Sequence, residues 1–313
     1  MVGVTNIDTV IHFIIIAMTK FASVATVQSA ITDEIFFALG LDRRGFLRRG
    51  LGWVFALPTR RFARFMTAVD AAMAEGGSPA GCRVMMESLQ VQIEARGREN
   101  IPVEGPVMIL ANHPGAYDSM AIGSLVLRRD LKAIVSGTRL YDSLPNLRPN
   151  VFFVSKDSAE NMQTLRDAID HLRGGGLLLQ FGSGKIEPDP ATDPVGDEVF
   201  AQWSPSVEIM LRKVPGLAVV PTVSSGVLLP WFRNHPLVRL RKGAMDKRRL
   251  AEFMQIIQQL IAPKSVEAHA QISFGEPFSL VDLETGSDGR RLMPAVIDRM
   301  KSQLAEHLRW IGK

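Results

Sequence analysis

Short apolar runs alternate with longer amphipathic stretches from about residue 89 to the end of the chain. Residues 89–97, "LQVQIEARG", alternate apolar and polar side chains with a period of two, which predicts a half-exposed strand. Residues 107–111, "VMILA", form a continuous apolar run, as is typical of a strand covered on both faces. Further strands are predicted at residues 132–136, 150–155, 177–181, 217–223 and 270–274. Helices are predicted at residues 119–127, 158–173, 205–213, 247–261 and 290–309.

Strands that alternate with helices of this length predict an α/β fold with a mostly parallel central sheet flanked by helices. In such sheets, reactive and ligand-binding groups gather in the loops at the carboxyl ends of the strands. Two of these loops have an unusual composition. They are "NHPGAYD", which follows residues 107–111, and "GSGKIEPDP", which follows residues 177–181.

The first 80 residues lack this alternation and predict an N-terminal helical, partly basic segment. Their apolar run at residues 10–18 is too short for a bilayer, which takes about 20 residues, and no Lys or Arg precedes it. We therefore expect neither a transmembrane helix nor an export signal, but a helix that is buried or rests on a membrane. The Gly-rich stretch "EGGSPAG" (75–81) suggests a division into residues 1–80 and an α/β domain at residues 81–313.

Composition narrows the class of partner. Hydrophobic residues make up 46% of the chain, enough for a sizeable core, and the net charge of +4 with a pI near 9.4 suits an anionic partner. The single cysteine, Cys82, excludes an intrachain disulfide and a cysteine-rich metal site. No helix-turn-helix, zinc or RNA-binding signature accompanies the charge, which argues against nucleic acid.

Residues 42–64 have the composition of a segment that lies at a membrane surface. Their apolar centre, "LGWVFALP", includes Trp53, and it is bracketed by Arg43, Arg44, Arg48, Arg49, Arg60, Arg61 and Arg64. Arginines bind anionic headgroups, and aromatic side chains settle at the boundary between headgroups and acyl chains. The alternative is a solvated basic face on a helix that packs on the domain through its apolar side.

The first unusual loop places a histidine and an aspartate five residues apart. Five residues turn a helix by about 500 degrees, so His113 and Asp118 cannot share one helix face. The Pro114-Gly115 turn lets them meet if His113 stays in the loop and Asp118 enters the following helix. A carboxylate on one ring nitrogen fixes the tautomer and leaves the other nitrogen to act as a general base. The alternative is a structural hydrogen bond at a helix N-terminus.

The second loop suggests a ligand-binding turn. "GSGK" resembles the end of a Walker A loop, but Leu179 and Ile186 stand where that pattern needs Gly and Ser or Thr. The loop still offers Gly182 and Gly184, which let backbone N–H groups approach a ligand, and the cation of Lys185. The alternative is a plain exposed turn.

Together these stretches resemble a known family. "SLQVQIEARGRENIPVEGPVMILANHPGAYDS" is similar to the opening of the glycerolipid acyltransferase superfamily, which includes the lysophosphatidate and glycerol-3-phosphate acyltransferases and carries a His-x4-Asp motif. The resemblance runs from about residue 89 to 276. His113 and Asp118 match the catalytic pair. "NVFFVSKD" resembles the second motif, with Lys156 where arginine is usual, and "VVPTV" and "ISFGEPF" match later parts of the domain.

"LLLQFGSGKIEPDP" occupies the position of the third motif, usually Phe-Pro-Glu-Gly-Thr-Arg, and departs from it. Phe181 and Gly184 match, whereas the Pro, Glu, Thr and Arg of the family are replaced by Gly182, Ser183, Lys185 and Ile186. Lys185 and Glu187 carry the same two charges out of step with the motif, Lys185 one residue before the position of its Arg and Glu187 four residues after that of its Glu. The resemblance thus implies an acceptor site that includes Lys156, Gly182, Ser183, Gly184, Lys185 and Glu187.

The resemblance implies an O-acyltransferase that moves a fatty acyl group from acyl-CoA or acyl carrier protein to the hydroxyl of a lysophosphatidate-like glycerolipid. His113 would remove the hydroxyl proton, Asp118 would orient His113, and backbone N–H groups of the two loops would stabilise the oxyanion. No metal or cofactor is implied beyond the co-substrate. The expected location is cytoplasmic, peripheral at the inner face of the membrane, on an anionic lipid surface and without nucleic acid.

Three alternatives remain from the sequence. One is a metal-dependent hydrolase that uses His113 and Asp118 as ligands, which requires at least one more ligand at metal spacing. The second is a catalytically silent, lipid-binding relative, because the third motif is altered. The third is an acyltransferase for a lysolipid without a phosphate.

Overall fold

The structure is a computed structural model that describes residues 21–38, 46–115, 117–137, 139–155, 157–284 and 292–313. The predicted apolar run at residues 10–18 lies outside these ranges, as do Arg43, Arg44 and Lys156.

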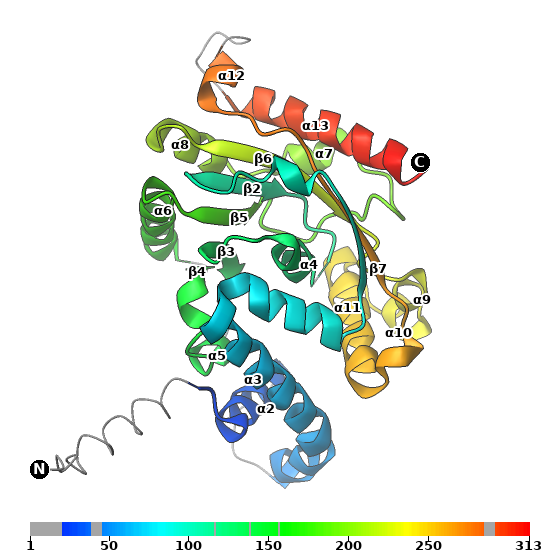
Figure 1. Cartoon of the computed structure of the whole chain (residues 1–313). Helices are drawn as coiled ribbons and strands as arrows, with labels where there is room; N and C mark the ends of the chain where they lie inside the picture. The colour runs from blue at the N-terminus through cyan, green and yellow to red at the C-terminus, as the bar shows by residue number, and fades with distance from the viewer. Residues whose placement is uncertain (1–20, 39–45, 116, 138, 156, 285–291) are drawn as a thin grey trace, which may run out of the picture.

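One mixed sheet forms the centre of the described chain (Figure 1). Its strands are β1 (Gln92–Arg96), β2 (Val107–Ala111), β3 (Leu131–Ser136), β4 (Val151–Val154), β5 (Leu177–Phe181), β6 (Ala218–Ser225) and β7 (His269–Phe274). They lie in the order β1-β7-β6-β2-β5-β3-β4, and every neighbouring pair is parallel except β6 and β7. The predicted α/β fold with a mostly parallel sheet is therefore confirmed.

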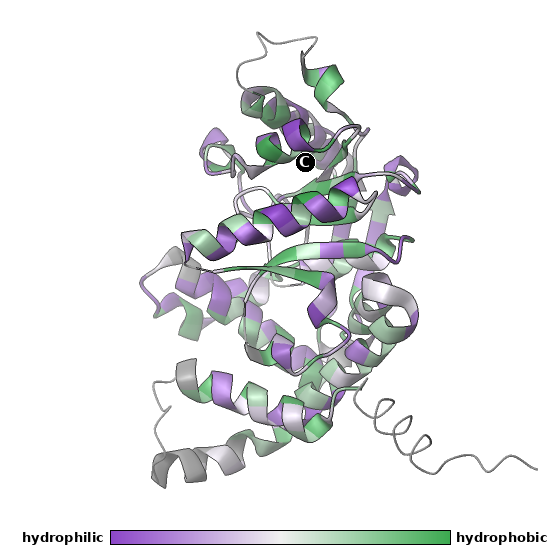
Figure 2. Ribbon diagram, turned by 90° about the vertical axis from the view of Figure 1, so that its left-hand side faces the viewer, coloured by the Kyte–Doolittle hydropathy of each residue, from purple (hydrophilic) through white to green (hydrophobic). Residues whose placement is uncertain are grey.

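Helices cover both faces of this sheet (Figure 1). The helices of the described residues are α2 (Val24–Ala38), α3 (Phe46–Ser88), α4 (Asp118–Leu125), α5 (Arg139–Asp142), α6 (Ser158–Arg173), α7 (Asp197–Phe200), α8 (Ser206–Lys213), α9 (Pro230–Arg233), α10 (Pro236–Arg239), α11 (Ala244–Ile261), α12 (Leu280–Glu284) and α13 (Met293–Trp310). Figure 2 shows hydrophobic strands between helices of mixed character, the pattern of a sheet buried on both faces.

The side chains of β2 supply both apolar cores because successive residues of a strand point to opposite faces. Val107 and Ile109 belong to the core that α2, α3 and α4 cover, whereas Met108 and Leu110 belong to the core under α6, α8 and α13. Every residue of β2 is buried. The continuous apolar run in the sequence has this physical cause.

The Gly-rich stretch at residues 75–81 lies inside α3, where the helix kinks at Gly77. The backbone there has φ 70°, and a Cβ on Gly77 would lie 2.3 Å from the carbonyl oxygen of Arg129. A side chain at this position would therefore strain the turn and strike the neighbouring loop. Helix α3 resumes after the kink and packs along α4. The division into two domains near residue 80 stays a prediction.

Sheet order places the two unusual loops side by side. Strand β2 lies between β5 and β6, and Ala111, its last residue, is paired with Phe181 of β5. The N–H of Gly182 continues this contact by donating to the carbonyl of Ala111 at 3.0 Å. Among the described residues, no helix has the length and apolar character needed to cross a bilayer.

Candidate active site

The turn after β2 is fixed to the neighbouring strand by Asn112. Its side-chain amide donates to the carbonyl of Ser224 at 2.9 Å, and its side-chain carbonyl accepts from the Ser224 N–H at 2.8 Å. Asn112 is buried, so these two bonds satisfy a polar group that would otherwise be costly. The polar residue that ends the apolar run therefore anchors the turn that presents His113.

His113 and Asp118 meet across this turn, as the sequence predicts. Nδ1 of His113 donates to Oδ2 of Asp118 at 2.8 Å, and the Asp118 side chain is fully buried while that of His113 is 22% exposed. Oδ2 also accepts from the N–H of Gly115, and Oδ1 accepts from the N–H of Ser119. The carboxylate is held at both oxygens, and the other imidazole nitrogen, Nε2, is left as the proton acceptor.

The imidazole of His113 also stacks on the ring of Phe181, with centroids 4.2 Å apart and planes 14° from parallel. Phe181 ends β5, so the two neighbouring strands together fix the plane of the imidazole. Burial lowers the pKa of His113, but the charge of Asp118 and its hydrogen bond raise it. Glu252 and Glu187 add to that rise, and the net pKa of His113 lies above its usual value.

The glycines of the second loop have structural tasks in the folded chain. A Cβ on Gly182 would lie 2.0 Å from the ring of Trp203, so only glycine fits against that buried indole. Gly184 has φ 63° and forms the turn itself. The hydroxyl of Ser183 donates to the carbonyl of Lys185 and accepts from its N–H, and Lys185 is exposed.

Backbone N–H groups of this loop were predicted to stabilise an oxyanion, yet several already have partners. Those of Gly182 and Gly184 donate to Ala111 and Phe181, and those of Lys185 and Glu187 donate to Ser183 and His113. An oxyanion at this site would need different donors or a rearranged loop.

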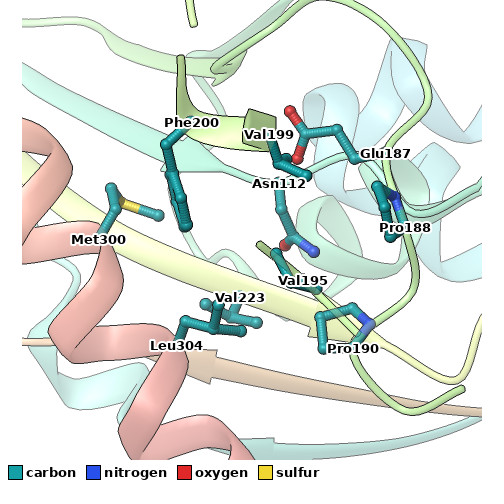
Figure 3. Close-up of a pocket in the computed structure, with 10 residues that line it drawn as sticks. All are labelled: Asn112, Glu187, Pro188, Pro190, Val195, Val199, Phe200, Val223, Met300 and Leu304. Carbon is teal, nitrogen blue, oxygen red and sulfur yellow. The ribbon is translucent and has the colours of Figure 1, made fainter. Parts of the chain in front are cut away.

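Glu187 lies in the interior rather than at an open headgroup site. It is 4% exposed, its Oε2 accepts from the N–H of His113 at 3.3 Å, and its own N–H donates to the carbonyl of His113 at 2.7 Å. Burial raises the pKa of this carboxyl. Figure 3 shows Glu187 beside Asn112 at an apolar pocket that α13 closes with Met300 and Leu304. Glu187 thus braces the backbone of His113, and its predicted contact with an acceptor stays a prediction.

Helix α11 brings side chains to the site that the sequence did not indicate. Gln255 donates to the hydroxyl of Tyr117 at 2.6 Å and to the carbonyl of Val227 at 2.8 Å. Glu252 is buried nearby, and burial, together with the charge of Asp118, raises its pKa to about 7. These residues are more than 130 positions from His113, and no local motif marks them, so only the folded chain reveals them.

The described residues also show how possible metal ligands and the single cysteine are placed. Among the described residues, no group of three or more His, Cys, Asp and Glu side chains has the arrangement of a metal site. Cys82 is buried, and burial raises the pKa of its thiol to about 12, so it is not a thiolate nucleophile at neutral pH.

No family model matches the chain, and comparison with curated proteins gives no match. Among solved structures, the chain is similar to the 1-acyl-sn-glycerophosphate (LPA) acyltransferase PlsC from Thermotoga maritima. The two share 16% sequence identity with a TM-score of 0.46, over 79% of this chain and 80% of that one.

Proposed function

We propose that this chain is an O-acyltransferase. It transfers a fatty acyl group from an acyl-CoA or acyl carrier protein thioester to the hydroxyl of a lysophosphatidate-like glycerolipid. The observation that carries the proposal is the His113–Asp118 pair, in which a buried, fully bonded carboxylate holds a half-buried imidazole at the end of a central strand. That arrangement is a general base aimed at a hydroxyl.

In the proposed reaction, Nε2 of His113 takes the proton of the acceptor hydroxyl as its oxygen attacks the thioester carbon. Asp118 stabilises the imidazolium that forms. The carbon–sulfur bond then breaks, and the imidazolium returns the proton to the departing thiolate. The protein needs no covalent intermediate, in agreement with the buried, protonated Cys82.

The proposed acceptor site lies in the second loop. Lys185 is an exposed cation three residues before the end of the "GSGKIEP" turn, and Lys156 is a second candidate at a position outside the described residues. In this proposal the two lysines bind a phosphate headgroup, with Gly182, Ser183 and Gly184 shaping the turn.

The proposed membrane contact lies on α3. Trp53 is 85% exposed and Leu57 62% exposed, and Arg60, Arg61 and Arg64 are exposed on the same helix face. The opposite face buries Ala63 and Met66 in the core. A tryptophan, a leucine and three arginines on one solvent-facing stripe suit an anionic lipid surface. We propose that this stripe holds the enzyme peripherally at the inner face of the membrane, where its acceptor resides.

An acyl-transfer assay tests the proposed function. Purified full-length chain is mixed with an acyl-CoA donor and lysophosphatidate, with and without a chelator. The diacyl product should form in both cases. His113→Ala should lower the rate by about 10²–10⁴, the usual contribution of a general base. The matched control is His269→Ala, because His269 is an exposed histidine at the start of β7 whose imidazole lies beside Glu94 rather than Asp118.

The outcomes separate the alternatives. A folded His113→Ala variant with wild-type turnover excludes the general base. A rate that disappears with chelator supports the metal-dependent reading. Lipid binding without any acyl transfer by the wild type supports the silent relative.

Vesicle binding tests the membrane contact. Replacing Arg60, Arg61 and Arg64 by Gln should weaken binding to anionic vesicles by about 1 kcal/mol per cation, and less as salt rises. The control replaces three exposed cations on other helices, Arg166, Lys213 and Arg309, by Gln. Equal losses in both variants would show that net charge, and not the α3 stripe, governs binding.

A further inference from the structure

Glu252 of α11 is a buried carboxyl to which the proposed reaction gives no role. It is 7% exposed, and its Oε1 has no hydrogen-bond partner among the described residues. A Cβ built on Gly115 would lie 3.7 Å from this oxygen. The carboxyl therefore packs against the turn that joins His113 to Asp118. A buried polar atom without a hydrogen-bond partner costs folding free energy, so its position beside His113 and Asp118 suggests a functional role.

Two of the carboxyls near His113, those of Asp118 and Glu252, have different surroundings. Asp118 accepts three hydrogen bonds, from the imidazole and from two backbone N–H groups. Glu252 has no such donors at Oε1. Burial and then the charge of Asp118 raise the pKa of Glu252 to about 7. With its pKa raised in this way, Glu252 is the buried carboxyl beside the pair that can carry a proton near neutral pH.

The charged groups around Glu252 come from the turn after β2, from α4 and from α11. His113 and Asp118 face it from the turn and α4, and Arg248 and Arg249 belong to its own helix. Arg248 is engaged elsewhere, with the carboxylate of Asp193 and the carbonyl of Glu187. Burial, with the charges of Asp189, Asp118 and Glu252, also raises the pKa of Tyr117. Among the described residues, no cation forms an ion pair with Glu252, so its charge acts chiefly on the pair that it faces.

We propose that Glu252 is a positioning residue that acts through the His113–Asp118 pair: its carboxyl charge sets how strongly His113 holds a proton. The inference rests on the proposed role of His113 as the base. With His113 neutral, Glu252 keeps its proton beside Asp118. When His113 takes the proton of the acceptor hydroxyl, the positive imidazolium favours ionised Glu252, and the negative charge stabilises the imidazolium in return. Glu252 releases its proton to solvent as His113 becomes positive and takes a proton back from solvent when His113 passes its own to the leaving thiolate, so no proton is gained or lost over the whole reaction.

A titration of His113 tests the proposal independently of acyl transfer. Histidine-labelled full-length wild type is compared by NMR with Glu252→Gln, which keeps the shape and removes the charge. The matched control is Asp246→Asn, the same charge change at an exposed position of α11. Glu252→Gln should lower the pH at which His113 titrates by about one unit, the lower end of a neighbouring charge's effect. Asp246→Asn should leave it unchanged, and Glu252→Asp, which restores the charge, should recover most of the shift.

The pH dependence of acyl transfer should shift in the same direction as the titration of His113. His113 must be neutral to accept a proton, so the acidic limb of kcat/KM against pH should move to lower pH in Glu252→Gln. The maximal rate should fall a few-fold, because a weaker base drives proton transfer less. A variant that merely loosened the fold would lower the rate without moving the limb.

The outcomes separate this inference from the proposed function. An unchanged His113 titration in folded Glu252→Gln overturns the inference whatever the activity. A shifted titration in a protein that transfers no acyl group supports the charge coupling and overturns only the proposed function. If Glu252→Gln does not fold, the ¹³C carboxyl signal of Glu252 in the wild type decides. Titration near neutral pH supports the inference, and titration near the ordinary value of about 4.3 overturns it.

Discussion

The turn after β2 and the loop after β5 lie at the same edge of the sheet and share a hydrogen bond, yet their side chains are used differently. In the turn, the predicted chemical residues face one another, and His113 keeps a partly exposed imidazole. In the loop, Gly182 and Glu187 face inward and support the turn, and Lys185 alone of these three is exposed. Glycines and charges in a strand-end loop can thus serve the neighbouring loop rather than a ligand.

The largest expected effect comes from removing the charge in the turn. Asp118→Asn should lower acyl transfer by about 10²–10⁴, because the amide neither stabilises the imidazolium nor fixes its tautomer. It should also weaken the turn, because the amide has one oxygen in place of two. Whichever backbone N–H then faces the amide nitrogen, that of Gly115 or that of Ser119, loses its acceptor. Steady-state rates and thermal unfolding of the same preparation measure the two effects. A folded variant with unchanged kcat would show that Asp118 has a structural role and no role in acyl transfer.

A smaller effect is expected at the exposed cation of the loop. Lys185→Met should raise KM for lysophosphatidate about ten- to hundredfold, since a charge-assisted hydrogen bond contributes about 1.5–3 kcal/mol. Hydrolysis of the donor thioester should hardly change, because it does not use the headgroup.

Lys213→Met, at an exposed lysine of α8, is the control for a lost surface charge. An unchanged KM for lysophosphatidate in Lys185→Met would indicate that the second loop supports the turn after β2 and does not bind the acceptor headgroup. If a neutral lysolipid is the better substrate from the outset, the acceptor carries no phosphate.

The smallest effect separates packing from ligand contact at the two glycines. Gly182→Ala should destabilise the protein by about 1–3 kcal/mol, because its Cβ meets the ring of Trp203. Gly184→Ala meets no atom and should cost only the left-handed backbone, about 1 kcal/mol. Urea unfolding measures both.

At urea concentrations well below the unfolding midpoint, both variants should retain acyl transfer. Loss of activity in Gly182→Ala without loss of stability would restore this glycine to the ligand-binding role that the sequence suggested.

The sequence by itself determined the local features of this protein. The period of apolar residues gave the strands and helices, because that period depends only on which face of each element is buried. The Pro-Gly turn between His113 and Asp118 made their meeting predictable from six consecutive residues. A histidine, a turn and a helix-starting aspartate are all local features, close together in the sequence.

Only the tertiary structure decided what surrounds the pair. Strand order brought Phe181 under the imidazole, and the fold buried Glu187 against the backbone of His113. Helix α11 brought Glu252 to the turn from a distant part of the chain. Hydrophobic patterns specify that a face is buried but not which residues bury it, because burial is non-directional. The neighbours of a reactive group, and hence its pKa, are fixed only when the elements pack.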